Sequence, residues 1–162
     1  MGKKLDKDKV YRIYVFDEIA KKTKRHLEDL GHYVDSLDHD KVKELCRHCS
    51  HSRKNGTYRF ISRGPNRWTV KVVNISDIYV RRINSNVNGY LSRNRWSLKK
   101  ISKDKKIPKL REFKKRGNIH SRSLHFIAHK KGDMYKLIDG NHRAIKLACS
   151  GQKEFKLVFY ER

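Results

Sequence analysis

The hydrophobic pattern changes from that of a strand to that of a helix within one short stretch near the C-terminus. Residues 135–138 form a short, partly apolar segment that ends at Asp139-Gly140, a strong turn signal. Beyond this turn, apolar side chains recur at helical spacing over residues 144–148, and Gly151 is placed to end the helix. The pattern therefore predicts a strand, a tight turn and a helix in immediate succession.

The N-terminal part of the chain has the spacing of helices. An apolar stripe over residues 9–30 predicts one long helix that ends at Gly31, and a second stripe predicts a helix over residues 40–49. Basic side chains decorate the first helix, either as a solvated face or as a surface that lies along a phosphate backbone. We assign residues 1–56 to a basic, helical N-terminal extension.

The central part of the chain predicts a hairpin and a loop. Residues 57–62 and 67–73 are strand candidates, joined by a turn at Gly64-Pro65-Asn66. In the second strand, a buried face alternates with a basic face. Residues 81–96 are rich in Asn, Ser and Arg, which predicts a polar loop.

The last third of the chain predicts a helix and three strands, in addition to the helix that follows Asp139-Gly140. Residues 108–117 are predicted to form an amphipathic helix, because Pro108 suits the first turn of a helix and Gly117 suits its end. Residues 123–129 and 134–138 form a second hairpin, and residues 154–160 form a closing strand. Because helices and strands mix along residues 57–162, we predict an α+β domain there.

The charge balance of the chain indicates the kind of partner that it binds. The 162 residues include 41 Lys and Arg against 17 Asp and Glu, which gives a formal net charge of +24. The natural counter-ion of such a field is a polyanion, so we expect nucleic acid, DNA rather than RNA, as the partner. Hydrophobic residues make up 36% and aromatic residues 10% of the chain, which argues against a disordered basic tail.

Membrane and secreted classes are disfavoured. No apolar run approaches the ~20 residues of a membrane helix, and the N-terminus lacks the apolar segment of a secretory signal. The three cysteines, an odd number, argue against a disulfide framework and for a reducing compartment. We therefore expect a cytoplasmic or nucleoid-associated protein with no membrane partner.

Basic side chains concentrate in two segments that we select as nucleic-acid contacts. The first is the polar loop with the residues that follow it, and the second is the predicted helix over residues 108–117. Arg predominates in the loop, and its planar guanidinium suits phosphate, although a plain surface loop is the alternative. The candidates are Arg81, Arg82, Arg93, Arg95, Lys99, Lys100, Lys114, Lys115 and Arg116.

A Cys-x-x-Cys pair followed by a histidine raises the possibility of zinc. Cys46, Cys49 and His51 have suitable spacing, but a structural zinc site needs four ligands and the sequence has no second cysteine pair. Both cysteines also lie on the apolar stripe of the predicted helix, where cysteine packs as a small hydrophobic residue. The pattern favours core packing over zinc binding and thiol redox chemistry.

The turn at residues 139–143 carries the candidate chemistry. At a helix start the backbone N–H groups and the helix dipole suit an anion. Arg143 can grip phosphate with two hydrogen bonds, and His142 can donate a hydrogen bond or transfer a proton. Asp139 can hold a divalent metal ion, orient His142 or cap the turn. The phosphate-binding candidates are Gly140, Asn141, His142 and Arg143, and the catalytic candidates are Asp139, His142 and Arg143.

The segment Asp139-Gly140-Asn141-His142-Arg143 resembles the signature of the ParB/sulfiredoxin-like superfamily. In that family a strand, a Gly-containing turn and a His-Arg or Arg-Arg pair open a helix and hold nucleotide phosphate. Further parts look like the family's first strand, the short turn after it, the helix before its second strand and its closing strand: residues 68–73, 75–78, 110–119 and 151–160. The resemblance implies a ParB/sulfiredoxin-like mixed sheet with helices over residues 57–162.

Departures from the family narrow what the resemblance implies. Asn141 stands where sulfiredoxins carry their reactive Cys, so sulfinic-acid repair is not expected. His142-Arg143 stands where CTP-binding ParB proteins usually have Arg-Arg, and no helix-turn-helix region is recognisable downstream. Members with the pattern Asp-Gly-x-x-Arg include nucleases, phosphohydrolases and a small-molecule kinase, all of which act on phosphates.

The function that follows is a nucleic-acid-binding protein with the activity of a ParB-like nuclease, a phosphodiesterase. The sparse carboxylates favour one divalent metal ion, Mg²⁺ or Mn²⁺, or none. One alternative is a phosphohydrolase, kinase or switch that binds ATP or CTP at the same turn, which the net charge does not favour. A second alternative is a non-enzymatic DNA- or RNA-binding module that only grips backbone phosphate.

Overall fold

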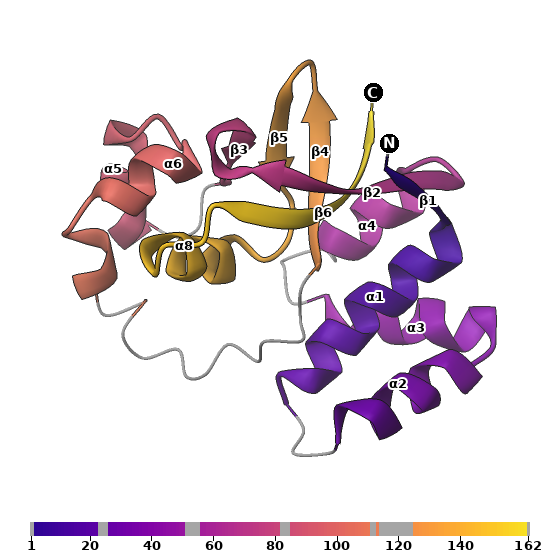
Figure 1. The fold of residues 1–162 in the computed structure, drawn as a ribbon. Coiled ribbons are helices and arrows are strands. Elements are labelled where there is room, and N and C mark those ends of the chain that lie inside the picture. The colour runs from indigo at the N-terminus through magenta and orange to yellow at the C-terminus, as the bar shows by residue number, and fades with distance from the viewer. Residues whose placement is uncertain are drawn as a thin grey trace. The chain divides into compact units, whose positions relative to one another are not determined.

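The computed structural model describes residues 2–22, 26–50, 56–81, 85–110, 113 and 125–161. The chain divides into two compact units (Figure 1). The helical unit is Lys3–Thr69, and the sheet unit is Val70–Arg162 together with Met1–Gly2. The division that we predicted after residue 56 falls inside the helical unit.

The helical unit is built around helix α1. Its elements are β1 (Lys3–Asp6), α1 (Lys7–Ala20), α2 (Leu27–Ser36), α3 (His39–Cys49) and α4 (Gly56–Arg63). Helix α1 packs against α2 and α3. Side-chain caps start two helices, since Asp6 accepts a hydrogen bond from the N–H of Lys9, and Asp38 accepts one from the N–H of Lys41. The helix predicted over residues 40–49 is confirmed as α3.

The single helix predicted over residues 9–30 is wrong. Helix α1 ends at Ala20, and α2 begins at Leu27 and continues through Gly31. The apolar stripe looked continuous because α1 and α2 pack on each other and bury residues in a shared interior.

The strand predicted over residues 57–62 is also wrong, because this segment is helix α4. Its buried residues Thr57 and Ile61 lie four positions apart, which is the spacing of one helix face. The predicted first hairpin is therefore absent, and only its second strand forms, as β2.

Six strands form one mixed sheet in the order β1-β2-β6-β4-β5-β3. The elements after α4 are β2 (Arg67–Asn74), the 3-10 helix η1 (Ile75–Asp77), β3 (Ile78–Tyr79), α5 (Ser85–Arg93), α6 (Leu98–Lys103), the 3-10 helix η2 (Ile107–Lys109), β4 (His125–Lys131), β5 (Met134–Leu137), α8 (Asn141–Cys149) and β6 (Glu154–Glu161). Strand β4 pairs antiparallel with β5 and parallel with β6, and β3 pairs parallel with β5. The second hairpin, the closing strand and the α+β class with a mixed sheet are thus confirmed.

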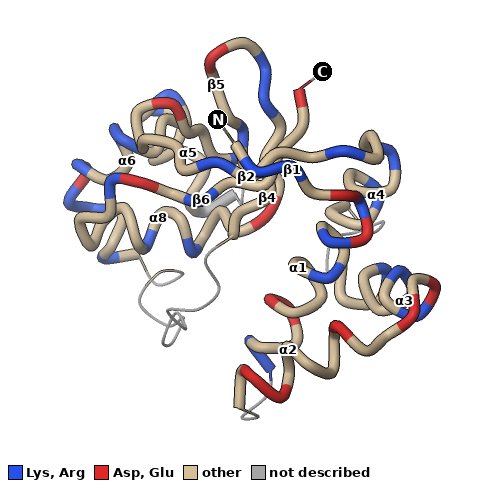
Figure 2. Tube along the Cα trace, turned by 45° about the vertical axis from the view of Figure 1, so that its right-hand side comes forward, with Lys and Arg blue, Asp and Glu red and all other residues tan. Residues whose placement is uncertain are grey.

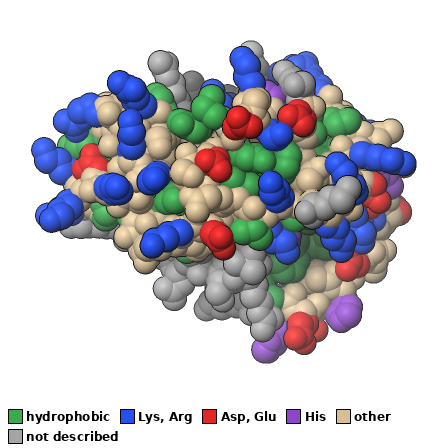
Figure 3. All heavy atoms as spheres, turned by 45° about the horizontal axis from the view of Figure 1, so that its top comes forward, with side chains coloured by type: hydrophobic (Ala, Val, Ile, Leu, Met, Phe, Trp, Pro, Cys, Tyr) green, Lys and Arg blue, Asp and Glu red, His purple; other side chains and the backbone are tan. Residues whose placement is uncertain are grey.

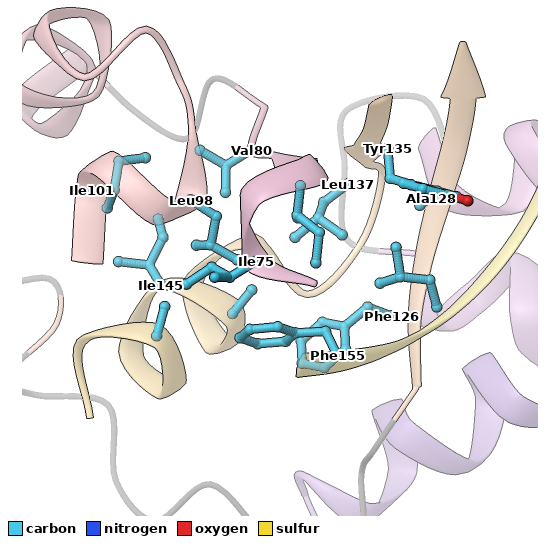
Figure 4. Packing of buried hydrophobic residues seen from close by; sticks show 14 of the residues in the cluster. Ile75, Val80, Leu98, Ile101, Phe126, Ala128, Tyr135, Leu137, Ile145 and Phe155 are labelled. Carbon is cyan, nitrogen blue, oxygen red and sulfur yellow. The ribbon is translucent and has the colours of Figure 1, made fainter. Parts of the chain in front are cut away.

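The core of the sheet unit lies between one face of the sheet and its helices (Figure 4). Alternate side chains of the strands point into this core, as strand geometry requires. Its members include Phe126, Ala128, Leu137, Phe155 and Leu157 from the strands and Leu98, Ile101, Ala144, Ile145 and Ala148 from the helices. Helix α6 packs against α8, so the core holds α8 and the turn before it in place.

The polar loop predicted over residues 81–96 is a helix for most of its described length. In α5, Val87 and Leu91 are buried four positions apart. The surrounding Asn and Ser residues concealed this spacing, because they suit both a loop and an exposed helix face. Of the helix predicted over residues 108–117, Pro108 lies in η2, and residues 111–112 and 114–117 lie outside the described residues.

Candidate functional site

The turn between β5 and α8 is built as the sequence predicts. The N–H groups of Ile138 and Asp139 both donate to the carbonyl oxygen of Ile127 on β4, at 2.8 and 3.2 Å. Gly140 follows with φ +81°, a left-handed conformation, and the first helical hydrogen bond of α8 runs from the N–H of Ala144 to the carbonyl of Gly140. The strand, turn and helix expected at this motif are confirmed.

Gly140 is required for two reasons. Its positive φ disfavours any residue with a side chain. A Cβ at this position would also lie 2.6 Å from Cδ1 of Phe126 and 3.2 Å from Nη2 of Arg143. The main chain of the turn therefore lies directly against the Phe126 ring of β4.

Arg143 is directed into the protein. Its Nη2 donates a 2.7 Å hydrogen bond to the carbonyl oxygen of His125, and its guanidinium carbon lies 4.4 Å from the centroid of the Phe126 ring. The side chain is half-buried. Arg143 thus ties the start of α8 to β4, and at least one of its donors is committed to the main chain.

The other side chains of the turn have different surroundings. Asn141 Oδ1 accepts a 2.8 Å hydrogen bond from the backbone N–H of Arg81, which follows β3 in the sequence. The His142 ring lies 5.6 Å from the ring of Phe113, and Asp139 is half-buried. The structure thus brings all five motif residues into one turn, and their roles in phosphate binding and catalysis stay predictions.

His125 lies next to this turn as a neutral side chain. The register of β4 places it beside Lys156 of β6, and its carbonyl accepts from Arg143. Burial, helped by the positive charges of Lys156 and Arg143, lowers the pKa of His125 from 6.5 to about 4. At neutral pH this imidazole therefore adds no positive charge to the site.

A pocket of about 630 Å³ opens between the end of β3, the corner after α5 and the β4–β5 hairpin. The pocket is lined by Tyr79, Val80, Arg81, Arg95, Trp96, His129, Lys131, Met134 and Lys136. We call this set the cationic pocket, because it includes four Arg and Lys side chains and no carboxylate. The hydrogen bond between Asn141 and the backbone of Arg81 links the motif turn to the edge of this pocket.

Long-range pairing assembles the cationic pocket. Strand β3 lies beside β5, which places Tyr79 opposite Lys136. The N–H of Val80 donates to the carbonyl of Trp96 at 2.9 Å, and Tyr79 forms an isolated β-bridge with Ser97. Three segments that are distant in the sequence therefore meet around one opening.

Arg95 and Trp96 enter the pocket from a strained corner. Their φ angles are +51° and +57°, which cost a residue with a side chain ~1–2 kcal/mol each. Hydrogen bonds from the N–H of Arg95 to the carbonyl of Ser92 and from that of Trp96 to Leu91 hold the corner. The core packing of Trp96 offsets part of the strain.

A second cationic surface runs from the end of α5 to η2. Exposed Lys and Arg side chains follow one another there. Figure 2 marks the Lys and Arg positions along α5 and α6, and Figure 3 shows Lys and Arg side chains gathered on one side of the molecule. The sole acidic residue of this segment, Asp104, accepts hydrogen bonds from the N–H of Lys106 and the side chain of Asn94. We call the following residues the basic face: Arg93, Arg95, Lys99, Lys100, Lys103, Lys105, Lys106 and Lys109.

The predicted nucleic-acid contacts divide between these surfaces. Arg81 lies in the pocket, Arg95 lies in both the pocket and the basic face, and Arg93, Lys99 and Lys100 lie in the basic face. Arg82, Lys114, Lys115 and Arg116 lie outside the residues whose side chains the structure describes. Sequence reasoning missed Trp96, Lys131 and Lys136 as site residues, although the basic hairpin turn beside Lys131 was a signal.

The cysteine cluster has the features of core packing. Cys46 is fully buried on α3, and burial and the nearby Glu18 carboxylate raise the pKa of the Cys49 thiol. A raised pKa keeps a thiol protonated, which opposes both metal binding and redox chemistry. His51 lies outside the described residues, within which no group of three or more potential metal ligands occurs.

No family model, curated protein or solved structure matches this chain. None of the described helices combines the length and the apolar character needed to cross a bilayer. The turn, the cationic pocket and the basic face are the described features that bear on function.

The fit of Gly140 against Phe126 predicts a specific loss of stability. Gly140→Ala should lower the free energy of unfolding by ~2–4 kcal/mol, since it adds a steric clash to the cost of a left-handed residue. Gly132→Ala is the matched control, because Gly132 has φ +58° and nothing within 4 Å of its Cβ position, and should cost only ~1 kcal/mol. Urea denaturation compares the two, and equal losses would refute the clash.

The lowered pKa of His125 predicts a loss of stability in acid. The unfolded chain takes up this proton near pH 6.5 and the folded chain only near pH 4, so stability contributed by His125 falls as the pH drops through this window. In His125→Gln, the melting temperature should fall less between pH 6.5 and 4 than in the wild type. His32→Gln, at an exposed histidine, should leave the wild-type pH profile unchanged.

Proposed function

We propose that this protein binds nucleic acid through the phosphate backbone, with the basic face as the main contact. The observation that carries the proposal is the composition of that face. Eight exposed cations follow one another from Arg93 to Lys109, and the single carboxylate among them, Asp104, is engaged by Lys106 and Asn94. Such a surface gains affinity by releasing the counterions of a polyanion.

The distribution of charge favours a long polyanion over a small ligand. The net charge of +24 exceeds what one nucleotide can neutralise. The basic face is formed by exposed side chains at the end of α5, on α6 and in the turns up to η2, a series that suits successive phosphates along a strand. We infer a DNA partner in the cytoplasm or at the nucleoid, and contacts of this kind carry no sequence preference.

The sheet unit is consistent with the ParB/sulfiredoxin-like type as part of this proposal. Support comes from the Asp139–Arg143 motif in a strand-turn-helix unit, from the need for glycine at position 140, and from the mixed sheet. Phosphodiester cleavage by Asp139, His142 and Arg143, with Mg²⁺ or Mn²⁺, stays a prediction of the resemblance, as does ATP or CTP binding at the same turn. Incubating bound DNA with each metal ion and with chelator tests cleavage directly.

A charge-matched pair of variants tests the basic face. Lys99→Gln with Lys103→Gln and Lys106→Gln removes three exposed cations of the face, whereas Lys3→Gln with Lys9→Gln and Lys22→Gln removes three from the helical unit. The first variant should reduce the slope of log K against log salt by ~2–3, because each lost phosphate contact removes ~0.7–0.9.

Fluorescence anisotropy of a labelled oligonucleotide at several salt concentrations measures both slopes. The control variant should keep the wild-type slope to within about one contact. Equal effects of the two variants would show that net charge alone acts and that the basic face is not the contact. Absence of any salt-dependent binding in the wild type would refute the proposed function itself.

A further inference from the structure

We propose that the cationic pocket binds an unpaired nucleotide, with its phosphate on the pocket cations and its base against Trp96. This inference rests on the proposed function and names the chemical class of its ligand. The pocket volume of about 630 Å³ lies within the ~300–1,000 Å³ typical of small-ligand sites.

The lining of the cationic pocket is strongly positive. Arg81, Arg95, Lys131 and Lys136 reach the pocket from three separate segments of the sheet unit. Among the described residues, no carboxylate lies within ion-pair distance of any of the four. Because like charges repel each other, bringing them together favours a multiply charged anion in the pocket, and phosphate fits this requirement.

The lining of the cationic pocket also has an aromatic and apolar part. Trp96 is half-buried, with part of the side chain packed on the core, and Met134 is 49% exposed. A bare phosphate needs no such surface, whereas a nucleobase gains from stacking on an indole ring and from contact with a thioether. Tyr79 adds a second aromatic side chain to the lining.

The backbone is strained at one corner of the cationic pocket. Two consecutive residues with side chains, Arg95 and Trp96, occupy left-handed conformations that the surrounding hydrogen bonds enforce. Backbone strain of this kind is found mostly at active sites and ligand-binding sites. Here it directs one cation and one aromatic side chain into the same pocket.

A pocket that holds a base favours single-stranded over double-stranded nucleic acid. A base within a duplex is stacked and paired, so its ring faces cannot reach a pocket without unstacking. Arg95 belongs to both the basic face and the pocket. A strand with phosphates on the basic face can therefore place one unpaired nucleotide in the pocket.

Tryptophan fluorescence gives a local readout. The chain has two tryptophans, and Trp68 is fully buried with its indole N–H bonded to the carbonyl of Pro65. Quenching by a bound base therefore reports on Trp96. The probes are oligo(dT), a blunt duplex with the same number of phosphates, and thymidine monophosphate.

The expected result is quenching of Trp96 by oligo(dT) and not by the duplex. Trp96→Leu should weaken oligo(dT) binding about tenfold, in line with the usual effect of removing one stacking partner, and change duplex binding less than about twofold. Trp96→Phe should restore most of the affinity. Lys131→Gln with Lys136→Gln, at exposed positions that need no repacking, should also weaken oligo(dT) binding.

Each remaining outcome is decisive. Unchanged oligo(dT) affinity in Trp96→Leu and in the double lysine variant, with a salt slope that still depends on the basic face, overturns the pocket and leaves the proposed function intact. Failure of every nucleic acid to bind overturns both. Thymidine monophosphate that quenches as well as oligo(dT) supports the pocket and identifies free nucleotides as its source.

Discussion

The contact between the main chain of Gly140 and the ring of Phe126 is the constraint on which the sheet unit depends. It holds the turn against β4 so closely that no Cβ fits. Arg143 crosses the same ring to reach the carbonyl of His125, and the two N–H groups before Gly140 bond to Ile127. Strand β5, helix α8 and strand β4 are therefore fixed to one another at a single point.

This constraint also gives the motif residues a positioning role. Asn141, at the first position of α8, accepts a hydrogen bond from the backbone N–H of Arg81. The N–H of the preceding residue, Val80, donates to the carbonyl of Trp96. The proposed nucleotide pocket is thus connected to the turn by two successive hydrogen bonds. In this chain, the motif that resembles a phosphate-binding signature is therefore hydrogen-bonded to the edge of a neighbouring cationic pocket.

Local patterns were predictable from the sequence, and long-range pairings were not. Gly140, Gly151 and regular apolar spacing made the turn, α8 and β6 predictable. Helix α5 was not predicted, because its Asn residues also suit a loop. In β2 the predicted alternation holds from Arg67 to Lys71 and breaks at Val72, which is 54% exposed whereas Val73 is buried. The pocket needs β3 beside β5, and no local pattern encodes that pairing.

The most direct test of the account is an NMR titration of the ¹⁵N-labelled protein with oligo(dT). Chemical shifts should change most at the Trp96 indole N–H, at backbone amides of residues 95–109 and at residues 131–136. These positions belong to the cationic pocket and the basic face. Changes confined to the helical unit, or to the turn at residues 139–143 alone, would contradict the account.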